Sequence, residues 1–184
     1  MKIRVLIVMS SLLLILVVIY FIFKPMPQSD TPAQLSPYIW QFDTDRLVSI
    51  SIRLPQLGKK ESWSKKEDLY WYFDDPENSP VNLERWDGGI PLILSGPRSV
   101  REIPAGSGIN AEKQYGLDTP AMIINLLLDT GEKVDVLVGD RVPDGSAYYI
   151  KLAGNNRIFT IDESWMSVLE RLVHDPPYNM RNMN

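Results

Sequence analysis

An uninterrupted apolar run near the N-terminus constrains this chain more than any other feature. Residues 5–23 read VLIVMSSLLLILVVIYFIF and contain no charged side chain. A helix needs about 20 apolar residues to cross the hydrocarbon core of a bilayer, and this run is close to that length. The sequence therefore predicts a transmembrane helix within residues 1–24. The rest of the 184-residue chain has room for one further domain.

The charges around the apolar run predict its orientation. Lys2 and Arg4 precede it, whereas Lys24 is the only basic residue that follows it before Arg46. By the positive-inside rule, the N-terminus stays in the cytoplasm and the rest of the chain is exported. A cleaved signal peptide has a shorter apolar stretch and small residues at its cleavage site. The bulky FIFKP at 21–25 therefore favours an uncleaved signal anchor over a removed signal peptide.

The exported part of the chain is acidic and lacks cysteine. Without Lys2, Arg4 and Lys24, 16 basic residues remain against 23 acidic ones, which is a net charge of −7. Such a domain repels phosphate backbones, and this argues against nucleic-acid binding. No disulfide framework is available without cysteine, so the domain has to be stabilised by its own core.

Composition also indicates the boundaries of the exported part. Residues 25–37, PMPQSDTPAQLSP, hold four prolines among polar side chains, which is typical of an extended linker. We expect an extracytoplasmic domain over residues 38–174. The polar end of the chain, 175–184, is expected to be a flexible tail.

Alternating apolar and polar residues predict a mainly antiparallel β-sheet. The clearest strand is LVSISIRL, at residues 47–54, in which every second side chain is apolar. Glycine-containing turns, DTGE and AGNN, each join two further strands. The remaining predicted strands are a hairpin with Trp63 in one strand and 69–73 in the other, then 98–103, 121–128, 133–138, 147–152 and 157–161.

Two segments favour helix. Ser79 followed by Pro80 fits an N-cap with proline at the first helical position, but GGIP at 88–91 interrupts the helical spacing that follows. We therefore expect two short helical pieces or one broken helix there, with a hinge or a binding feature at the break. Near the C-terminus, Asp162 can cap a helix that carries an apolar stripe over 165–172.

These elements predict the α+β fold class. One N-terminal transmembrane helix precedes a mainly antiparallel sheet domain with flanking helices. The order of strands and helices is similar in the two halves of the domain, which allows for two similar sub-halves.

Three short elements of the chain resemble the motifs of a known family. In chain order they are Trp71 with Pro76, then YGLDTP with Tyr115, Gly116, Leu117 and Pro120, and finally VGD and YYI with Gly139, Tyr148 and Tyr149. With these elements in this order, residues 47–173 resemble the bacterial domain of unknown function 4340 family. Its members are typically membrane-anchored, and some occur with auxiliary components of gliding-motility-type ABC transporters. The resemblance implies an inner-membrane protein whose partner is another membrane protein or complex, and it supplies no catalytic residue.

The YGLDTP run allows two interpretations. In the structural one, Gly116 closes a short helical turn in the left-handed conformation. Tyr115 then buries its ring, and Pro120 directs the chain into the next strand. In the functional one, the aromatic and glycine residues form a recognition corner. We favour the structural interpretation, because each residue type has a local reason to be there.

Acidic and histidine side chains offer no complete metal or catalytic site. The runs FDTDR (42–46) and VGDRVPDGS (138–146) hold the oxygen ligands that calcium prefers, yet such residues are also common in turns. His174 is the only histidine and cysteine is absent, so this chain cannot assemble a zinc site or a cysteine–histidine pair. We predict no metal, no cofactor and no enzyme activity.

The sequence therefore predicts a membrane-anchored binding or scaffolding module. Its partners would be the lipid bilayer and a transporter or other multisubunit membrane complex. The alternative is an extracytoplasmic domain that senses a small ligand or a cell-wall glycan. A deep pocket lined by aromatic and polar side chains would favour the sensor, whereas an exposed apolar patch would favour the binding module.

Overall fold

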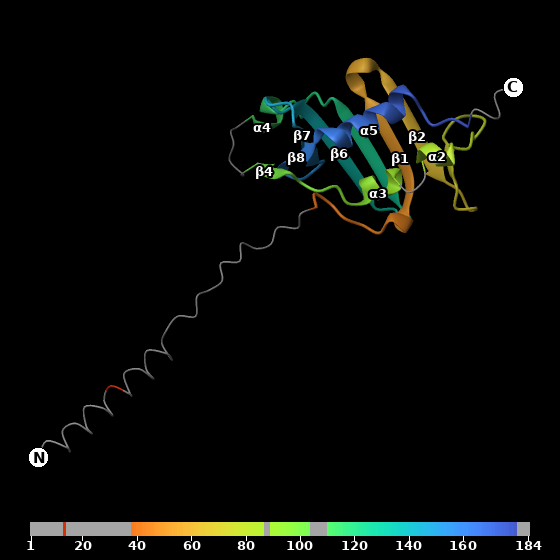
Figure 1. Ribbon diagram of the computed structural model, residues 1–184, viewed down its shortest axis with the longest axis horizontal. Helices are drawn as coiled ribbons and strands as arrows, with labels where there is room; N and C mark the ends of the chain where they lie inside the picture. Colours follow the sequence, from red (N-terminus) through yellow and green to blue (C-terminus); the bar gives the residue numbers. More distant parts are fainter. Residues whose placement is uncertain (1–12, 14–37, 87–88, 104–109, 180–184) are drawn as a thin grey trace, which may run out of the picture. The chain divides into compact units, whose positions relative to one another are not determined.

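Antiparallel strands dominate the part of the chain that the structure describes. A computed structural model describes residues 13, 38–86, 89–103 and 110–179, and Pro37–Asn184 forms one compact unit. The strands of these residues form an eight-stranded sheet in the order β3-β2-β1-β5-β6-β7-β8-β4, and every neighbouring pair is antiparallel (Figure 1). The strands are β1 (Leu47–Leu54), β2 (Lys59–Lys65), β3 (Trp71–Phe73), β4 (Arg101–Ile103), β5 (Met122–Leu128), β6 (Lys133–Arg141), β7 (Ala147–Leu152) and β8 (Ile158–Asp162). The predicted α+β class and mainly antiparallel sheet are confirmed.

The two halves of the domain share this sheet. Strands β1, β2 and β3 follow one another outward from the middle of the sheet, and β5, β6, β7 and β8 do the same on the other side. Strand β4 belongs to the first half in sequence, yet it pairs with β8 of the second half. The halves are therefore parts of one sheet and do not form separate units.

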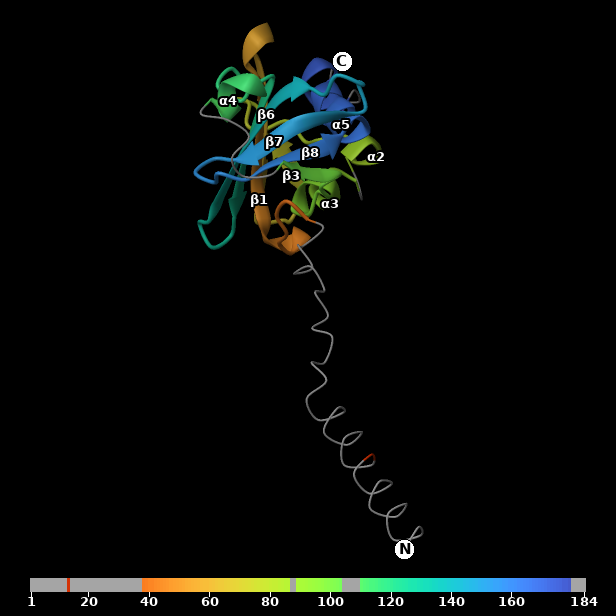
Figure 2. The same ribbon diagram turned by 90° about the vertical axis from the view of Figure 1, so that its left-hand side faces the viewer.

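The closing helix α5 (Glu163–His174) covers one face of the sheet (Figure 1 and Figure 2). Its N-cap is Asp162, whose side chain accepts a hydrogen bond from the Ser164 backbone N–H at 2.8 Å, as the sequence predicts. The helix contacts β1, β2, β7 and β8. It buries a stripe of apolar side chains, which are Met166, Leu169, Leu172 and Val173.

Strand alternation builds a core on each face of the sheet. On β7, Ile150 belongs to the main core beneath α5, whereas the adjacent Tyr149 packs on the opposite face. That second, smaller core consists of Ile103, Tyr115, Leu117 and Ile158, with Leu137 and Tyr149 packed against it. The short helix α4 (Ala111–Gln114) directly precedes Tyr115. The YGLDTP run therefore covers part of the sheet face that α5 leaves open.

The helical segment in the middle of the chain is broken, as its glycine and proline residues predict. It consists of α2 (Leu83–Trp86) and α3 (Ile90–Ser95). Two tryptophans satisfy carbonyl groups in the last turn of α3, where a helix lacks internal donors. The indole N–H of Trp40 donates to the Leu94 carbonyl at 2.7 Å, and that of Trp165 donates to the Ile93 carbonyl at 3.0 Å.

The predicted start of this helical segment is wrong. Pro80 forms a bridge with Tyr72 of the edge strand β3, and α2 begins three residues later, at Leu83. Asn82 caps it instead, since its side-chain oxygen accepts a hydrogen bond from the Arg85 backbone N–H at 3.3 Å. A proline cannot donate to a strand ladder, but it is tolerated beside an edge strand, and this pairing displaces the helix start.

Residues 175–179 of the predicted tail pack against the domain, and the rest of that prediction, 180–184, lies outside the described residues. Tyr178 forms a bridge with Val81, and its ring stacks on Phe73 with 3.9 Å between ring centroids. The Pro177 carbonyl accepts a hydrogen bond from the Asn82 backbone N–H at 2.7 Å. The apolar ring of Tyr178 explains this packing, because it covers core that would otherwise face water.

The predicted transmembrane helix falls outside these observations. Its residues 1–24, and the predicted linker over 25–37, lie outside the described residues apart from Leu13. Among the residues that are described, no helix is long and apolar enough to cross a membrane.

Candidate functional site

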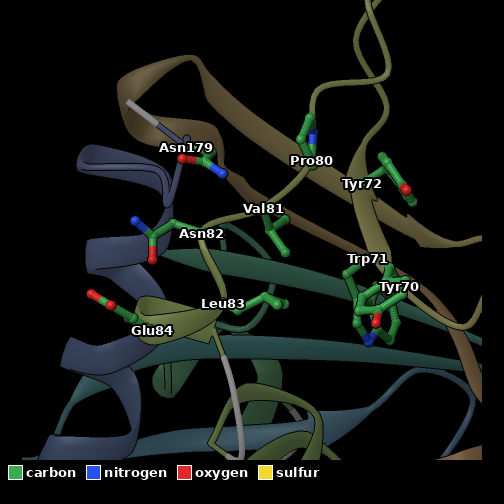
Figure 3. A pocket seen from close by; sticks show the side chains of 9 residues that line it. All are labelled: Tyr70, Trp71, Tyr72, Pro80, Val81, Asn82, Leu83, Glu84 and Asn179. Atoms are coloured by element: carbon green, nitrogen blue, oxygen red, sulfur yellow. The ribbon is translucent and has the colours of Figure 1, made fainter. Parts of the chain in front are cut away.

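A groove lies beside strand β3, at one end of the sheet. Two adjoining cavities, of about 520 and 340 Å³, share Tyr70, Trp71 and Leu83 in their linings. Figure 3 shows the lining of the first cavity. Volumes of this order are typical of ligand-binding pockets. The other lining residues are Tyr72, Pro80, Val81, Asn82, Glu84 and Asn179 in the first cavity, and Thr44, Asp45, Lys65, Leu69, Trp86, Pro91 and Leu92 in the second.

The floor of the groove rests on a cluster of buried aromatic rings. Trp71 packs against Trp86 at 5.4 Å between ring centroids, and Trp86 packs against Trp63 at 5.2 Å. Phe73 lies beside Trp63 at 5.8 Å. Such pairs contribute beyond their buried area, so the floor is a rigid part of the main core.

Asp68 holds one wall of the groove in place. Its carboxylate accepts hydrogen bonds from the Tyr72 hydroxyl at 2.7 Å and from the Tyr70 backbone N–H at 3.1 Å. These bonds lower the pKa of Asp68, with the Tyr72 hydroxyl as the larger cause. The same bond raises the pKa of Tyr72. Asp68 is therefore a positioning residue for the turn that presents Tyr70.

Leu69, in the same turn, has a backbone conformation that leucine rarely adopts. Its φ is 67°, in the left-handed region that costs an L-residue about 1–2 kcal/mol. The turn is closed by hydrogen bonds from Leu69 N–H to the Lys66 carbonyl and from Lys66 N–H to the Tyr70 carbonyl. Glycine is the residue that hairpin turns of this kind favour at the left-handed position. An apolar side chain is thus displayed at some cost to stability, a pattern typical of functional sites.

Hydrogen bonds to the C-terminal segment hold α2, the opposite wall of the groove, in place. Arg85 of α2 donates to the Asp175 carboxylate at 2.8 Å and to the Asp175 carbonyl at 2.7 Å. It also reaches the Pro176 carbonyl at 3.2 Å. These contacts fix α2, and they orient Leu83 toward Trp71 and Tyr70 (Figure 3).

Four large apolar side chains that line the groove are exposed. Leu69 is 72% exposed, Leu92 61%, Tyr70 55% and Leu83 46%. They come from three separate segments, namely the β2–β3 turn, α2 and α3. Single exposed leucines are ordinary, but a group of them around one hollow is characteristic of an interaction surface.

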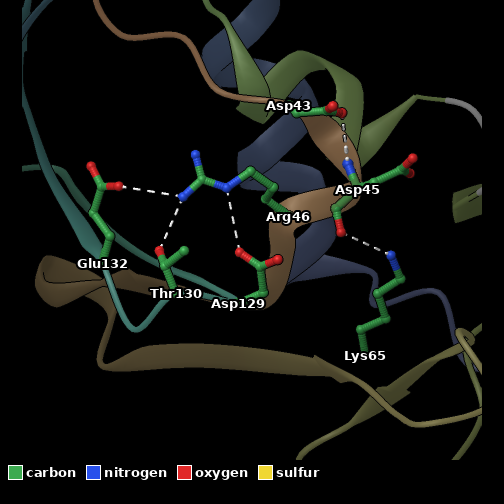
Figure 4. A network of polar contacts seen from close by, with 7 residues as sticks. All are labelled: Asp43, Asp45, Arg46, Lys65, Asp129, Thr130 and Glu132. Carbon is green, nitrogen blue, oxygen red and sulfur yellow. Dashed lines mark hydrogen bonds and ion pairs between the residues drawn. The ribbon is translucent and has the colours of Figure 1, made fainter.

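Two carboxylates and one lysine supply the charge of the groove lining. Asp45 lines one cavity and Glu84 the other, and neither makes an ion pair with another described residue. The Lys65 ammonium donates to the Asp45 backbone carbonyl at 3.3 Å (Figure 4). Arg46, which follows Asp45 in the sequence, points instead toward Asp129, Thr130 and Glu132 (Figure 4). The lining is therefore weakly acidic.

The YGLDTP motif contacts the VGD and YYI motifs outside the groove. The Tyr115 carbonyl accepts a hydrogen bond from the Asp140 backbone N–H at 2.8 Å, and the Tyr115 ring lies 4.4 Å from that of Tyr149. Gly116 has a φ of 68°, and Leu117 is buried beside them. These residues, with Gly139, act as the joint that attaches the α4 segment to the sheet.

The remaining motif residues lie in different places. Trp71 lines the groove, whereas Pro76 is exposed in the loop that follows β3. Pro120 precedes β5, and it is partly buried. Tyr148 packs against the main core, and Arg141 lies 5.9 Å from its ring centroid.

The acidic runs serve as turns and caps. The Asp43 carboxylate accepts a hydrogen bond from the Asp45 backbone N–H at 3.2 Å, and that of Asp144 accepts one from the Ser146 backbone N–H at 2.9 Å. No group of three potential metal ligands lies together in the described ranges. His174 is exposed at the end of α5, with Lys59 at 3.2 Å and Glu170 at 3.5 Å.

Sequence reasoning identified Trp71 and missed the rest of the groove. Tyr70, Leu83 and Leu92 are ordinary members of apolar patterns, and only their packing leaves them exposed. One signal was visible in the sequence. Leu69 follows KKED, where a polar turn residue would be expected.

The fold defines the class of this protein as an α+β domain built on one antiparallel sheet, with a joint at Tyr115 and Gly139 and a groove beside β3. Residues 71–175 match the family described as Domain of unknown function (DUF4340). The chain belongs to this family, as its motifs suggest. No curated protein and no solved structure matches the chain.

Proposed function

We propose that this protein is a single-pass, membrane-anchored binding or scaffolding module that acts outside the cytoplasm, as an accessory subunit of a transporter or another multisubunit membrane complex. The apolar run at 5–23 supports the anchor, and its basic N-terminal flank supports the orientation. The module itself would act by binding and not by catalysis.

The observation that carries this proposal is the group of exposed apolar side chains around the groove. Leu69, Tyr70, Leu83 and Leu92 expose apolar surface to water, and a partner that covers this surface lowers the free energy. The packed aromatic floor and the hydrogen-bonded walls of the groove favour binding. Their side chains lose little conformational entropy when a partner binds, because they are already held in place.

The lining of the groove also gives some support to the alternative, a small-ligand or glycan sensor. Tyr70 and Trp71 offer aromatic faces, and Asn82 and Glu84 offer polar groups nearby. The groove is open at its surface, however, and three of its four exposed large apolar members are leucines. Exposed aliphatic side chains around a hollow suit an apolar protein surface better than a hydrophilic sugar, so we place the sensor second.

Copurification of the full-length chain from native membranes tests the proposal. Solubilised membranes should yield a membrane protein bound to the wild-type chain. That protein should be lost from the Tyr70→Ser, Leu83→Ser double variant and retained by Leu57→Ser, which removes a leucine of similar exposure outside the groove lining. Equal recovery with all three chains would contradict the proposal.

A further inference from the structure

We propose that the groove beside β3 binds a basic segment of a partner protein. An apolar side chain of the segment would lie between Tyr70 and Leu83, and lysine or arginine side chains would lie beside Asp45 and Glu84. This inference rests on the proposed function and names the chemistry of the partner that the groove accepts.

The apolar contact is defined by the residues that the two cavities share. Tyr70, Trp71 and Leu83 line both cavities, so one inserted side chain can contact all three. Trp71 is 8% exposed over the aromatic cluster, which makes it a firm floor. A few residues, with tryptophan and tyrosine prominent among them, supply most of the binding free energy in protein interfaces.

Charge complementarity identifies the flanks of the segment as basic. Asp45 and Glu84 lie in different cavities, on either side of the shared residues, and form no ion pair with the described residues. The one lysine of the lining, Lys65, is already directed to the Asp45 carbonyl. An acidic segment would meet two unneutralised carboxylates, whereas a basic one would pair with both.

The backbone around the groove indicates that side chains, and not a strand ladder, make the contact. A partner strand could add to β3 only through free backbone groups. The outer edge of β3 is already used, because Phe73 N–H donates to the Ser79 carbonyl and Val81 N–H donates to the Trp71 carbonyl. A segment in the groove therefore makes its contacts with side chains.

Selection from a phage-displayed library of random peptides tests the inference. The bait is the full-length chain in detergent micelles, with peptides counter-selected against Tyr70→Ser, Leu83→Ser. We expect enriched peptides to share an apolar residue flanked by lysine or arginine. Their affinity should fall about tenfold or more in Tyr70→Ser and remain unchanged in Leu57→Ser.

The salt dependence of peptide binding tests the proposed contacts of Asp45 and Glu84 with basic side chains. Added salt should weaken binding of the enriched peptides to the wild-type chain, because it screens the two carboxylates. The Asp45→Asn, Glu84→Gln variant should bind them several-fold more weakly, with a smaller salt dependence. Circular dichroism of each variant should match that of the wild type, since the substituted side chains are at the surface.

Several outcomes would overturn the inference. These are enrichment of acidic peptides, the absence of any enriched motif, binding that survives Tyr70→Ser, or binding of soluble glycan fragments in place of peptides. The copurification experiment separates this failure from failure of the proposed function. A membrane partner that depends on Tyr70 and Leu83, combined with no basic motif, would refute the segment chemistry and leave the binding module in place.

Discussion

Gly139 lies directly against the backbone of Tyr115, because a Cβ atom at position 139 would be 2.1 Å from the Tyr115 carbonyl oxygen. This contact joins two motifs whose contacting residues are 24 positions apart in the sequence. It allows the Asp140 backbone N–H to reach the same carbonyl at 2.8 Å. The absence of a side chain at residue 139 is therefore what lets the α4 segment dock on the sheet.

Replacement of this glycine should destabilise the domain. We expect Gly139→Ala to lower the unfolding free energy by about 2–3 kcal/mol, because the new methyl group forces the segments apart in a packed region. Urea denaturation measures the change. Gly96→Ala is the matched control, since its Cβ would meet only ordinary contacts, the nearest at 3.4 Å from Tyr38 Cδ1. Equal stability of the two variants would contradict this account of the joint.

The Leu69 side chain should lower the stability of the domain and strengthen partner binding. Its φ of 67° suits glycine, so Leu69→Gly should raise the unfolding free energy by up to about 1 kcal/mol. The same change removes an apolar side chain from the groove and should weaken partner recovery. Thermal unfolding and copurification measure the two effects. A less stable Leu69→Gly chain, or one that binds as well as the wild type, would show that the strained leucine has no such role.

The N-cap of α5 should contribute to acid sensitivity. Hydrogen bonds from the Ser164 side chain and backbone lower the pKa of Asp162 in the folded state. Because the folded pKa is below the unfolded value, this stabilisation is present above the usual pKa of about 4 and is lost as the pH falls through the folded value. Asp162→Asn keeps a capping oxygen without the charge. Its unfolding free energy should therefore decline less steeply than that of the wild type as the pH falls below about 4.

Glu61 is a control for Asp162, because its pKa shifts in the opposite direction on folding. Burial, and then the charge of Asp75, raise its pKa in the folded state. The wild-type chain therefore loses stability as the pH rises through that value. Glu61→Gln should be more stable than the wild type at neutral pH, and the difference should vanish in acid. The same pH slope in the wild type, Asp162→Asn and Glu61→Gln would contradict both assignments.

The proposed anchor predicts the effect of a charge within the apolar run. Leu14→Arg places a guanidinium near the middle of residues 5–23, where it costs about 2.5–3.5 kcal/mol on insertion scales. We expect the variant to leave the membrane fraction after carbonate extraction, whereas Leu14→Val should stay. Full retention of Leu14→Arg would contradict the anchor.

Local sequence patterns were enough to predict most strands. The alternation in LVSISIRL places β1 at Leu47–Leu54, and the turns DTGE and AGNN place the β5–β6 and β7–β8 pairs. The break between α2 and α3 also follows from local residues, since glycine and proline end helices wherever they are packed. Features of this kind depend on a few neighbouring residues.

Features that depend on distant contacts could not be predicted in the same way. Pro80 carries a good helix-start signal, and its pairing with Tyr72 depends on where the edge of the sheet falls. Tyr178 is packed because Phe73 presents a ring to it. The groove has the same origin, as Asp45, Tyr70, Leu83 and Leu92 come from separate segments. Their shared exposure exists only after folding.

Site-specific photo-crosslinking in intact native cells tests the central claim most directly. A photoreactive amino acid would replace Leu92 in the groove or, as controls, Leu57 and Val100, which are similarly exposed elsewhere. The account predicts that position 92 crosslinks to one discrete membrane protein and that positions 57 and 100 do not. Crosslinking of the same protein from all three positions, or from positions 57 and 100 alone, would contradict the groove as the contact surface.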